Sequence, residues 1–203
     1  MPRRRDVDGQ RAALSAATWA VLAEQGLAGL TLRAVAERAG CSTGLVLHAF
    51  PGKRALLVHA RELLHRRSAE RAEAAEAAAQ AAGADPWEVL RAALVQALVV
   101  DERTREDARV WTGFLAAAVA DPELAALHAA HHLVFVRRVE RLLARCRPDL
   151  PPGRRTDEAV ALVALVEGVT ALAGVDPATY PARRQRAAVD LALERSRAAA
   201  PRG

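Results

Sequence analysis

Apolar residues recur at three- and four-residue intervals along most of the chain, which is the spacing of an amphipathic helix. The first such segment covers residues 13–25, and its apolar face consists of Leu14, Ala17, Val21 and Leu22. Gly26 follows it as a helix-ending residue. Glycine and proline residues interrupt the pattern between the later segments, so the chain is predicted to be all-α with separate helices.

Two more short helices and one long helix follow. Thr31 is placed to cap the second helix, and Gly40 ends it. Ser42 is placed to cap a third helix over residues 43–50. From Lys53 to Ala82 the sequence contains no proline or glycine, which predicts a helix of roughly 45 Å.

Five further helices are predicted, at residues 86–101, 104–119, 122–146, 156–173 and 181–198. Asp85-Pro86-Trp87-Glu88 supplies a cap, a proline in the first turn and a glutamate three residues after the cap. Asp121-Pro122-Glu123 repeats the arrangement. A loop rich in proline, including Pro151, Pro152 and Gly153, is expected before the penultimate helix, and the total is about nine helices.

The composition argues against a membrane or secreted protein. The longest charge-free apolar stretches, Val110–Ala120 and Ala159–Val166, are shorter than the roughly 20 residues that span a bilayer. The N-terminus lacks the apolar region of a secretory signal. Two cysteines, Cys41 and Cys146, are too few for a disulfide scaffold. We therefore expect a soluble, cytoplasmic protein without a membrane partner.

The excess positive charge lies in the first third of the chain. The net charge is +5, and the residues up to Arg61 include nine basic and four acidic side chains, while the remainder is balanced. A basic segment attached to an otherwise neutral chain favours contact with a polyphosphate. The alternative is a basic surface that contacts only solvent.

Residues 32–50 have the pattern of a helix-turn-helix. Ala36 is small where two helices cross, and Gly40 sits at the turn, where a left-handed backbone is needed. The outward residues of the second helix are Thr43, Gly44, Leu47 and His48, which are free to meet DNA. The alternative is a helical hairpin that is not a helix-turn-helix, because such a hairpin shares this pattern.

A longer run resembles the N-terminal domain of tetracycline-repressor (TetR) family regulators. The resemblance rests on Ala13-Leu14, Ala16-Ala17, Glu24-Gln25-Gly26, Thr31-Leu32, Val35-Ala36-Glu37-Arg38-Ala39-Gly40, Ser42-Thr43-Gly44, His48, Phe50 and Lys53. The rest of the chain is similar to the subgroup typified by the repressor of glycine-betaine synthesis (BetI-like). That similarity rests on Trp111, Phe114, Asp121-Pro122-Glu123-Leu124 and Glu167-Gly168.

The resemblance implies a ligand-responsive regulator, expected to be a repressor, that binds a pseudo-palindromic operator in double-stranded DNA as a homodimer. A small-molecule effector releases the operator. Residues 1–54 would form the helix-turn-helix domain, and residues 55–203 the ligand-binding and dimerisation domain. The resemblance implies no enzyme activity, no cofactor and no metal.

Motif position also implies the DNA contacts. Thr31, His48 and Lys53 would contact phosphates, and a second group would face the major groove: Ser42, Thr43, Gly44 and Leu45. Arg33 and Leu47 complete the expected set. The family commonly has a tyrosine at the position of Leu47 and an aromatic at that of Ala49. We therefore expect recognition to depend on arginines and on apolar contact with thymine methyl groups.

The effector site is expected among three successive helices. Its candidate residues are Trp111, Phe114, His132, Phe135 and Glu167. Their chemistry suggests a mostly apolar molecule with one or two polar or cationic groups. Core packing is the alternative for the aromatic residues, and an exposed position at the rim of its helix is the alternative for Glu167.

Two other classes of function are weighed against this one. His128 and His132 are spaced to share a metal on one helix, but the sequence offers no residues to complete such a site. An all-helical enzyme would need paired acid–histidine motifs, a nucleophile elbow or a phosphate loop, which the sequence lacks. The remaining alternative is a helical scaffold or adaptor that does not bind DNA.

Dimerisation is expected through the last two helices. The penultimate helix is apolar around most of its circumference, at Ala159, Val160, Leu162, Val163, Leu165, Val166, Val169 and Leu172. The final helix adds Leu191, Ala192 and Leu193. A two-fold four-helix bundle would bury these faces, and Leu165→Arg is expected to give monomers.

Overall fold

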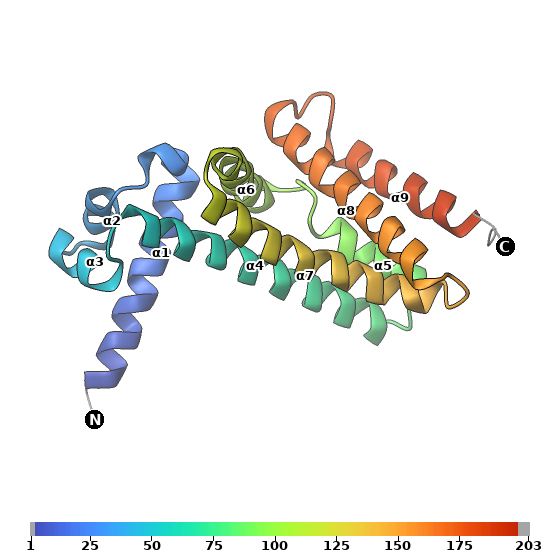
Figure 1. Cartoon of the computed structure of the whole chain (residues 1–203), viewed down its shortest axis with the longest axis horizontal. Helices are drawn as coiled ribbons and strands as arrows, with labels where there is room; N and C mark the ends of the chain where they lie inside the picture. The colour runs from blue at the N-terminus through green and yellow to red at the C-terminus, as the bar shows by residue number, and fades with distance from the viewer. Residues whose placement is uncertain (1–2, 199–203) are drawn as a thin grey trace. The chain divides into compact units, whose positions relative to one another are not determined.

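The computed structural model describes residues 3–198, with side chains from residue 9 onwards, and over this range the chain forms nine α-helices and no strand (Figure 1). The helices are α1 (Arg3–Gly29), α2 (Leu32–Ala39), α3 (Thr43–Ala49), α4 (Lys53–Ala81), α5 (Pro86–Val95), α6 (Glu102–Ala120), α7 (Pro122–Cys146), α8 (Pro152–Val175) and α9 (Ala182–Ala198). The predicted all-α fold is confirmed.

The chain packs into two compact units. The first contains the described residues up to Arg66 together with Arg109–His128, and the second contains Arg67–Ala108 and the described residues from Ala129 onwards. Helices α4, α6 and α7 each contribute residues to both units. A division at residue 54 would assign α6 and all of α4 after Arg54 to the C-terminal domain, so that functional boundary stays a prediction.

The core of the first unit joins α1, α2, α3 and the first turns of α4. The buried residues include Leu14, Val21, Val35, Val46, Phe50 and Leu56. Val110 and Phe114 of α6 belong to the same cluster. The apolar face predicted for the first helix is therefore the one that packs into this core.

The core of the second unit is formed by α5, α7, α8 and α9. Its buried residues include Leu90, Leu94, Val139, Leu143, Leu162, Val163, Val166 and Val189. Helix α9 lies against α8 and α5 (Figure 1). This packing explains the apolar residues on the inner side of α8, because that side is interior.

Several helix ends differ from the sequence-based expectation. Helix α1 begins at Arg3, and Gly26, where φ is 66°, breaks it as its position predicted, before helical residues continue to Gly29. Helix α5 ends at Val95 and does not reach residue 101. Beyond it, the buried side chain of Gln185 accepts a hydrogen bond from the Val99 N–H at 2.9 Å and donates one to the Val99 carbonyl at 2.8 Å. The Val99 backbone is thus satisfied without a helix.

Helix α8 begins at Pro152, where a loop was expected. Proline is tolerated in the first turn of a helix because the N–H that it lacks has no partner there. Residues 152–175 also contain an 18-residue window with a mean hydropathy of 1.8, of which 39% is buried. By length and composition α8 is able to cross a membrane. The length expected from uninterrupted apolar stretches was too short, because Glu167 is the only charged residue between Ala159 and Val175. One such helix is weak evidence, since core helices pass the same test.

Candidate nucleic-acid interface and effector site

The turn between α2 and α3 has the geometry of a helix-turn-helix. Gly40 adopts a left-handed conformation, with φ 65° and ψ 34°, as its position predicted. Thr31 caps α2 by accepting a hydrogen bond from the Ala34 N–H at 3.0 Å, and Ser42 caps α3 by accepting one from the Leu45 N–H at 3.2 Å. Both hydroxyl groups act as acceptors here and keep their own proton for donation to another group.

Helix α3 has one buried face and one exposed face. Val46 is completely buried, and Leu45 is half-buried. The exposed positions are Thr43, Gly44, Leu47, His48 and Ala49, together with the cap Ser42. The residues expected to face the major groove are therefore accessible, except that Leu45 lies partly against the unit.

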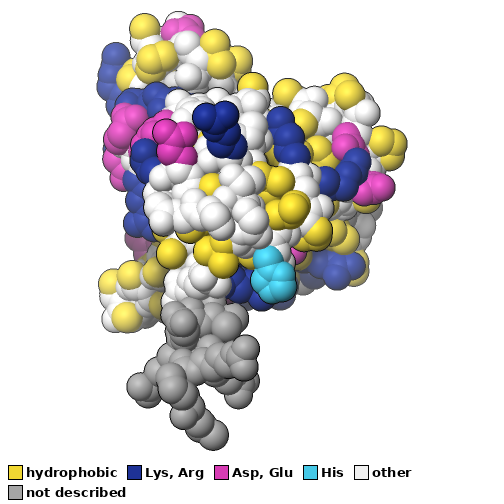
Figure 2. All heavy atoms as spheres, turned by 90° about the vertical axis from the view of Figure 1, so that its left-hand side faces the viewer, with side chains coloured by type: hydrophobic (Ala, Val, Ile, Leu, Met, Phe, Trp, Pro, Cys, Tyr) yellow, Lys and Arg dark blue, Asp and Glu magenta, His cyan; other side chains and the backbone are white. Residues whose placement is uncertain are grey.

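The basic side chains around α2 and α3 fall into two groups. Arg38 binds Glu24, and Arg54 binds Asp121 at 2.9 Å and also Glu123. Arg33 and Lys53 are exposed at the beginnings of α2 and α4. Figure 2 faces α1–α3 and shows Lys and Arg side chains, with hydrophobic side chains gathered beside a histidine. The structure thus offers exposed cations near the recognition helix.

A buried histidine joins α1 to α4 within the first unit. The His59 Nε2 lies 2.8 Å from the Ser15 hydroxyl, and its ring packs against Phe50 with 4.7 Å between ring centroids. Burial lowers the pKa of His59 below its usual value, and the positive charge of Arg66 lowers this pKa further. His59 and Phe50 also line an open depression of about 420 Å³.

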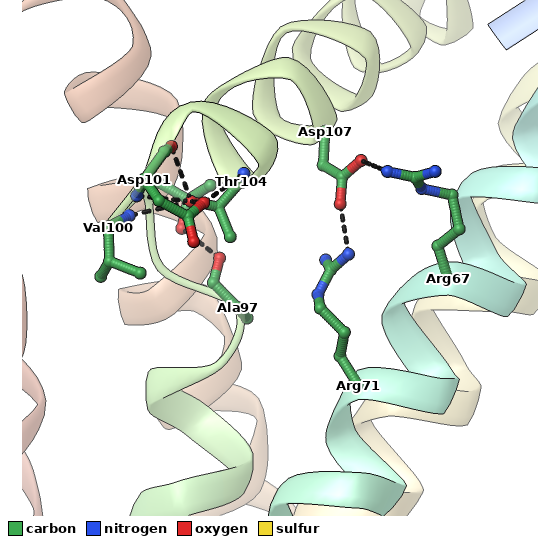
Figure 3. A network of polar contacts seen from close by, with 8 residues as sticks. Arg67, Arg71, Ala97, Val100, Asp101, Thr104 and Asp107 are labelled. Carbon is green, nitrogen blue, oxygen red and sulfur yellow. Dashed lines mark hydrogen bonds and ion pairs between the residues drawn. The ribbon is translucent and has the colours of Figure 1, made fainter.

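In the second unit, Asp107 of α6 lies between two arginines of α4 (Figure 3). Its carboxylate is 3.2 Å from the Arg67 guanidinium and also binds that of Arg71. Asp107 is only 5% exposed. This ionic contact fixes the first half of α6 against the second half of α4.

The N-terminus of α6 is held by a separate polar cluster in Figure 3. The Thr104 hydroxyl accepts hydrogen bonds from the N–H groups of Val100 and Asp101 at 2.9 and 3.0 Å. The Asp101 carboxylate accepts one from the Thr104 N–H at 2.8 Å. Hydrogen bonds from Thr104 lower the pKa of Asp101. These hydrogen bonds therefore hold the beginning of α6 in place within the second unit.

A second buried ionic contact joins α7 to α4. Arg138 is 8% exposed and donates to Glu73 at 2.8 Å and to Glu76 at 2.9 Å. Neither Asp107 nor Arg138 was found by sequence reasoning. Both lie in segments with many charges, so nothing in the pattern separates these buried residues from their exposed neighbours.

The candidate effector residues divide between the two units. His132 and Glu167 lie together in the second unit, with 3.1 Å between Nδ1 and Oε1, and both are partly exposed. Phe135 packs against the core of the same unit. Trp111 and Phe114 belong to the first unit, where Phe114 is 2% exposed within the core. Effector contact by these five residues stays a prediction.

Metal binding gains no support from the described histidines. Among the residues whose side chains are described, no group of three His, Cys, Asp or Glu side chains is arranged to hold a metal ion. Cys146 is protonated at neutral pH, because burial raises the pKa of its thiol to about 11.

Two short helices meet at a turn formed by Gly40, and the second of them exposes one face. The same chain also contains a helical unit with its own core. These features define a helix-turn-helix transcriptional regulator. Residues 14–60 match the family model described as bacterial regulatory proteins, tetR family, and residues 86–198 match the model described as BetI-type transcriptional repressor, C-terminal. The chain belongs to the TetR family of transcriptional regulators, with a BetI-type C-terminal region. It is a DNA-binding transcriptional regulator and not an enzyme.

Individual relatives agree with this. The chain is 34% identical over 170 residues to the HTH-type transcriptional regulator BetI of Burkholderia thailandensis, which covers 83% of this chain and 84% of the relative. A transcriptional regulator from Rhodococcus sp. Rha1 superposes with a TM-score of 0.78 at 30% identity, covering 90% of this chain and 93% of that one. A regulator from Saccharomonospora viridis, solved in complex with choline, has the same fold, with a TM-score of 0.75, 16% identity and coverages of 93% and 96%.

Proposed function

We propose that the protein is a cytoplasmic, homodimeric repressor without a membrane partner, that it binds a pseudo-palindromic operator, and that a small-molecule effector releases it. The observation that carries the proposal is the exposed face of α3 beside a left-handed Gly40. A recognition helix held in this way is suited to the major groove. Paired half-sites about one turn of DNA apart require two such helices, hence a dimer.

The DNA contacts divide by chemistry. Thr31, Arg33, His48 and Lys53 would bind phosphates or fix the register, because their exposed donors lie on or beside the recognition helix. Residues 42–45 and 47 would face the bases, with Leu45 contributing only its exposed part.

An exposed apolar strip on α8 supports the dimer. The strip consists of Val160, Ala161, Ala164, Gly168, Leu172 and Val175, all exposed in the single chain. On α9, Leu191 is exposed as well. Pairing two such strips across a two-fold axis would cover apolar surface that one chain leaves in water. Leu165 packs against its own core, so a substitution there does not test the interface.

The partly exposed His132–Glu167 pair supports an effector with a polar or cationic group. A carboxylate that shares its oxygen with one imidazole still accepts further hydrogen bonds or binds a cation. Phe135 packs against the core of the same unit, whereas Trp111 and Phe114 pack in the core of the other unit. The choline bound to the Saccharomonospora viridis regulator is a molecule of this class and is a suitable first probe.

The binding experiment uses duplexes from the DNA that flanks the coding region. We expect the wild type to bind one of these in preference to a scrambled duplex, with affinity that falls steeply with salt. Lys53→Ala should weaken binding to both duplexes alike and reduce the salt slope by roughly one. Arg183→Ala, which removes an exposed arginine of α9, is the matched control and should change neither the affinity nor the salt slope. Equal, salt-insensitive affinity for both duplexes would contradict the proposal.

A further inference from the structure

Leu47 is an exposed leucine on the recognition helix. Its exposed fraction is 50%, and among the described side chains of α1–α4 it is the only large apolar one that is exposed. Val46 and Phe50 already supply the buried apolar side of this segment, at 0% and 4% exposure. The core therefore does not explain the leucine at position 47.

The neighbours of Leu47 define the surface to which it belongs. Thr43 lies one helical turn before it, and both side chains are exposed on the same side of α3. Gly44 is three residues before Leu47. A Cβ added at Gly44 would meet only the Ser42 Oγ, at 3.8 Å, so the packing of the protein does not require glycine there. Without a side chain at Gly44, the backbone of α3 is open to close approach by a partner.

The chemistry of leucine restricts what that partner offers. A leucine side chain neither donates nor accepts a hydrogen bond, so it gains nothing from a phosphate or from a polar base edge. In the major groove, the one apolar group on a base pair is the C5 methyl of thymine.

We propose that Leu47 contacts the C5 methyl group of one thymine in each operator half-site and thereby determines specificity at that position. The inference rests on the proposed binding of α3 in the major groove. The Thr43 methyl group extends the same apolar surface, and the open backbone at Gly44 allows the approach that the contact needs. The operator therefore carries an A·T pair at this step, oriented with its thymine toward Leu47.

Replacement of thymine by uracil removes only this methyl group and so isolates the contact. A duplex that binds the full-length protein is first enriched from a random-sequence pool, and each thymine in its half-sites is then changed to uracil in turn. We expect one position per half-site at which uracil weakens wild-type binding roughly fourfold, the effect of burying one methyl group. At the other thymines, uracil should bind as well as thymine.

The variants assign the effect to the side chain. Leu47→Ala should bind thymine and uracil duplexes equally at that position. Leu133→Ala, which removes a leucine of similar exposure from α7, should keep the wild-type discrimination.

Three outcomes would overturn the inference. Tolerance of uracil by the wild type at every thymine would do so without any variant, and so would unchanged discrimination by Leu47→Ala. A pool that yields no preferred sequence would contradict sequence-specific DNA binding itself, and the thymine contact with it. The failure of the contact alone is therefore distinguishable from the failure of the proposed function.

Discussion

At the scale of single residues, a few buried polar side chains hold helices that are otherwise rich in alanine. Asp107 is the clearest case, because one carboxylate with 6% of its side chain exposed faces two guanidinium groups. Removal of the carboxylate would leave Arg67 and Arg71 near each other without the negative charge that lies between them.

Asp107→Ala should therefore lower the free energy of unfolding by about 2 kcal/mol. Urea denaturation followed by circular dichroism measures this change. Glu102→Ala is the matched control, because Glu102 is an exposed acid of the same helix that binds Arg105. It should cost less than about 0.5 kcal/mol. An equal loss of unfolding free energy in both variants would show that the buried ionic contact stabilises the fold no more than the exposed one.

The buried His59 predicts how stability depends on pH. Its folded pKa lies below the usual 6.5, so on acidification the unfolded chain binds the proton first. The contribution of His59 is complete above about pH 6.5 and is lost as the pH falls below it. The charged groups that act on the ring are Arg11, Glu62 and Arg66.

We expect the free energy of unfolding of His59→Gln to fall less steeply than that of the wild type between about pH 6.5 and pH 5. Denaturation at a series of pH values measures this change. His48→Gln, which changes an exposed histidine of α3, serves as the control and should leave the slope unchanged. A slope that persists in His59→Gln would assign the acid sensitivity to other groups.

At the scale of elements, the short α2 and α3 depend on their connecting turn. Gly40 has a positive φ, and a Cβ added there would meet no atom within 4 Å. The cost of another residue at this position is therefore backbone strain and not a clash.

Gly40→Ala should cost about 1 kcal/mol of stability, and Gly40→Asn should cost less than half of that, because asparagine adopts the left-handed conformation more readily. Thermal or urea denaturation of the two variants distinguishes them. If the asparagine variant is as unstable as the alanine variant, strain at φ 65° is not the cause.

The sequence predicted these elements well where the signals are local. Thr31, Ser42 and Asp85 cap helices where their side chains suggested, because a cap involves residues only two or three positions away. The end of α5 was missed because it depends on Gln185, a residue distant in sequence. The accessible face of α3 followed from helical periodicity, whereas the buried Asp107 did not, because its environment is created by α4.

At the scale of the whole molecule, the exposed strip on α8 requires an explanation that one chain does not supply. Val160 and Leu172 are each nearly half-exposed, and Val175 is 82% exposed. A helix that is apolar on both its inner and its outer side is consistent with burial in a two-fold bundle.

Ala164→Arg should convert dimers to monomers and weaken operator binding strongly, because half-sites need paired readers. Size-exclusion chromatography with light scattering gives the mass. Val119→Arg, at an exposed position of α6, is the control and should remain dimeric. Leu165→Arg should instead destabilise the fold, since Leu165 packs against the core of its own chain. A dimeric Ala164→Arg protein would place the interface elsewhere.

The most direct test of the account is a competition titration with the intact protein. A labelled duplex from the DNA that flanks the coding region is bound first, and unlabelled flanking or scrambled duplex is then added at fixed salt. We expect two copies of the chain per duplex, and displacement by the flanking sequence at least 10³-fold more readily than by the scrambled one, roughly the lower bound for specific binding. Equal displacement by the two duplexes would contradict it.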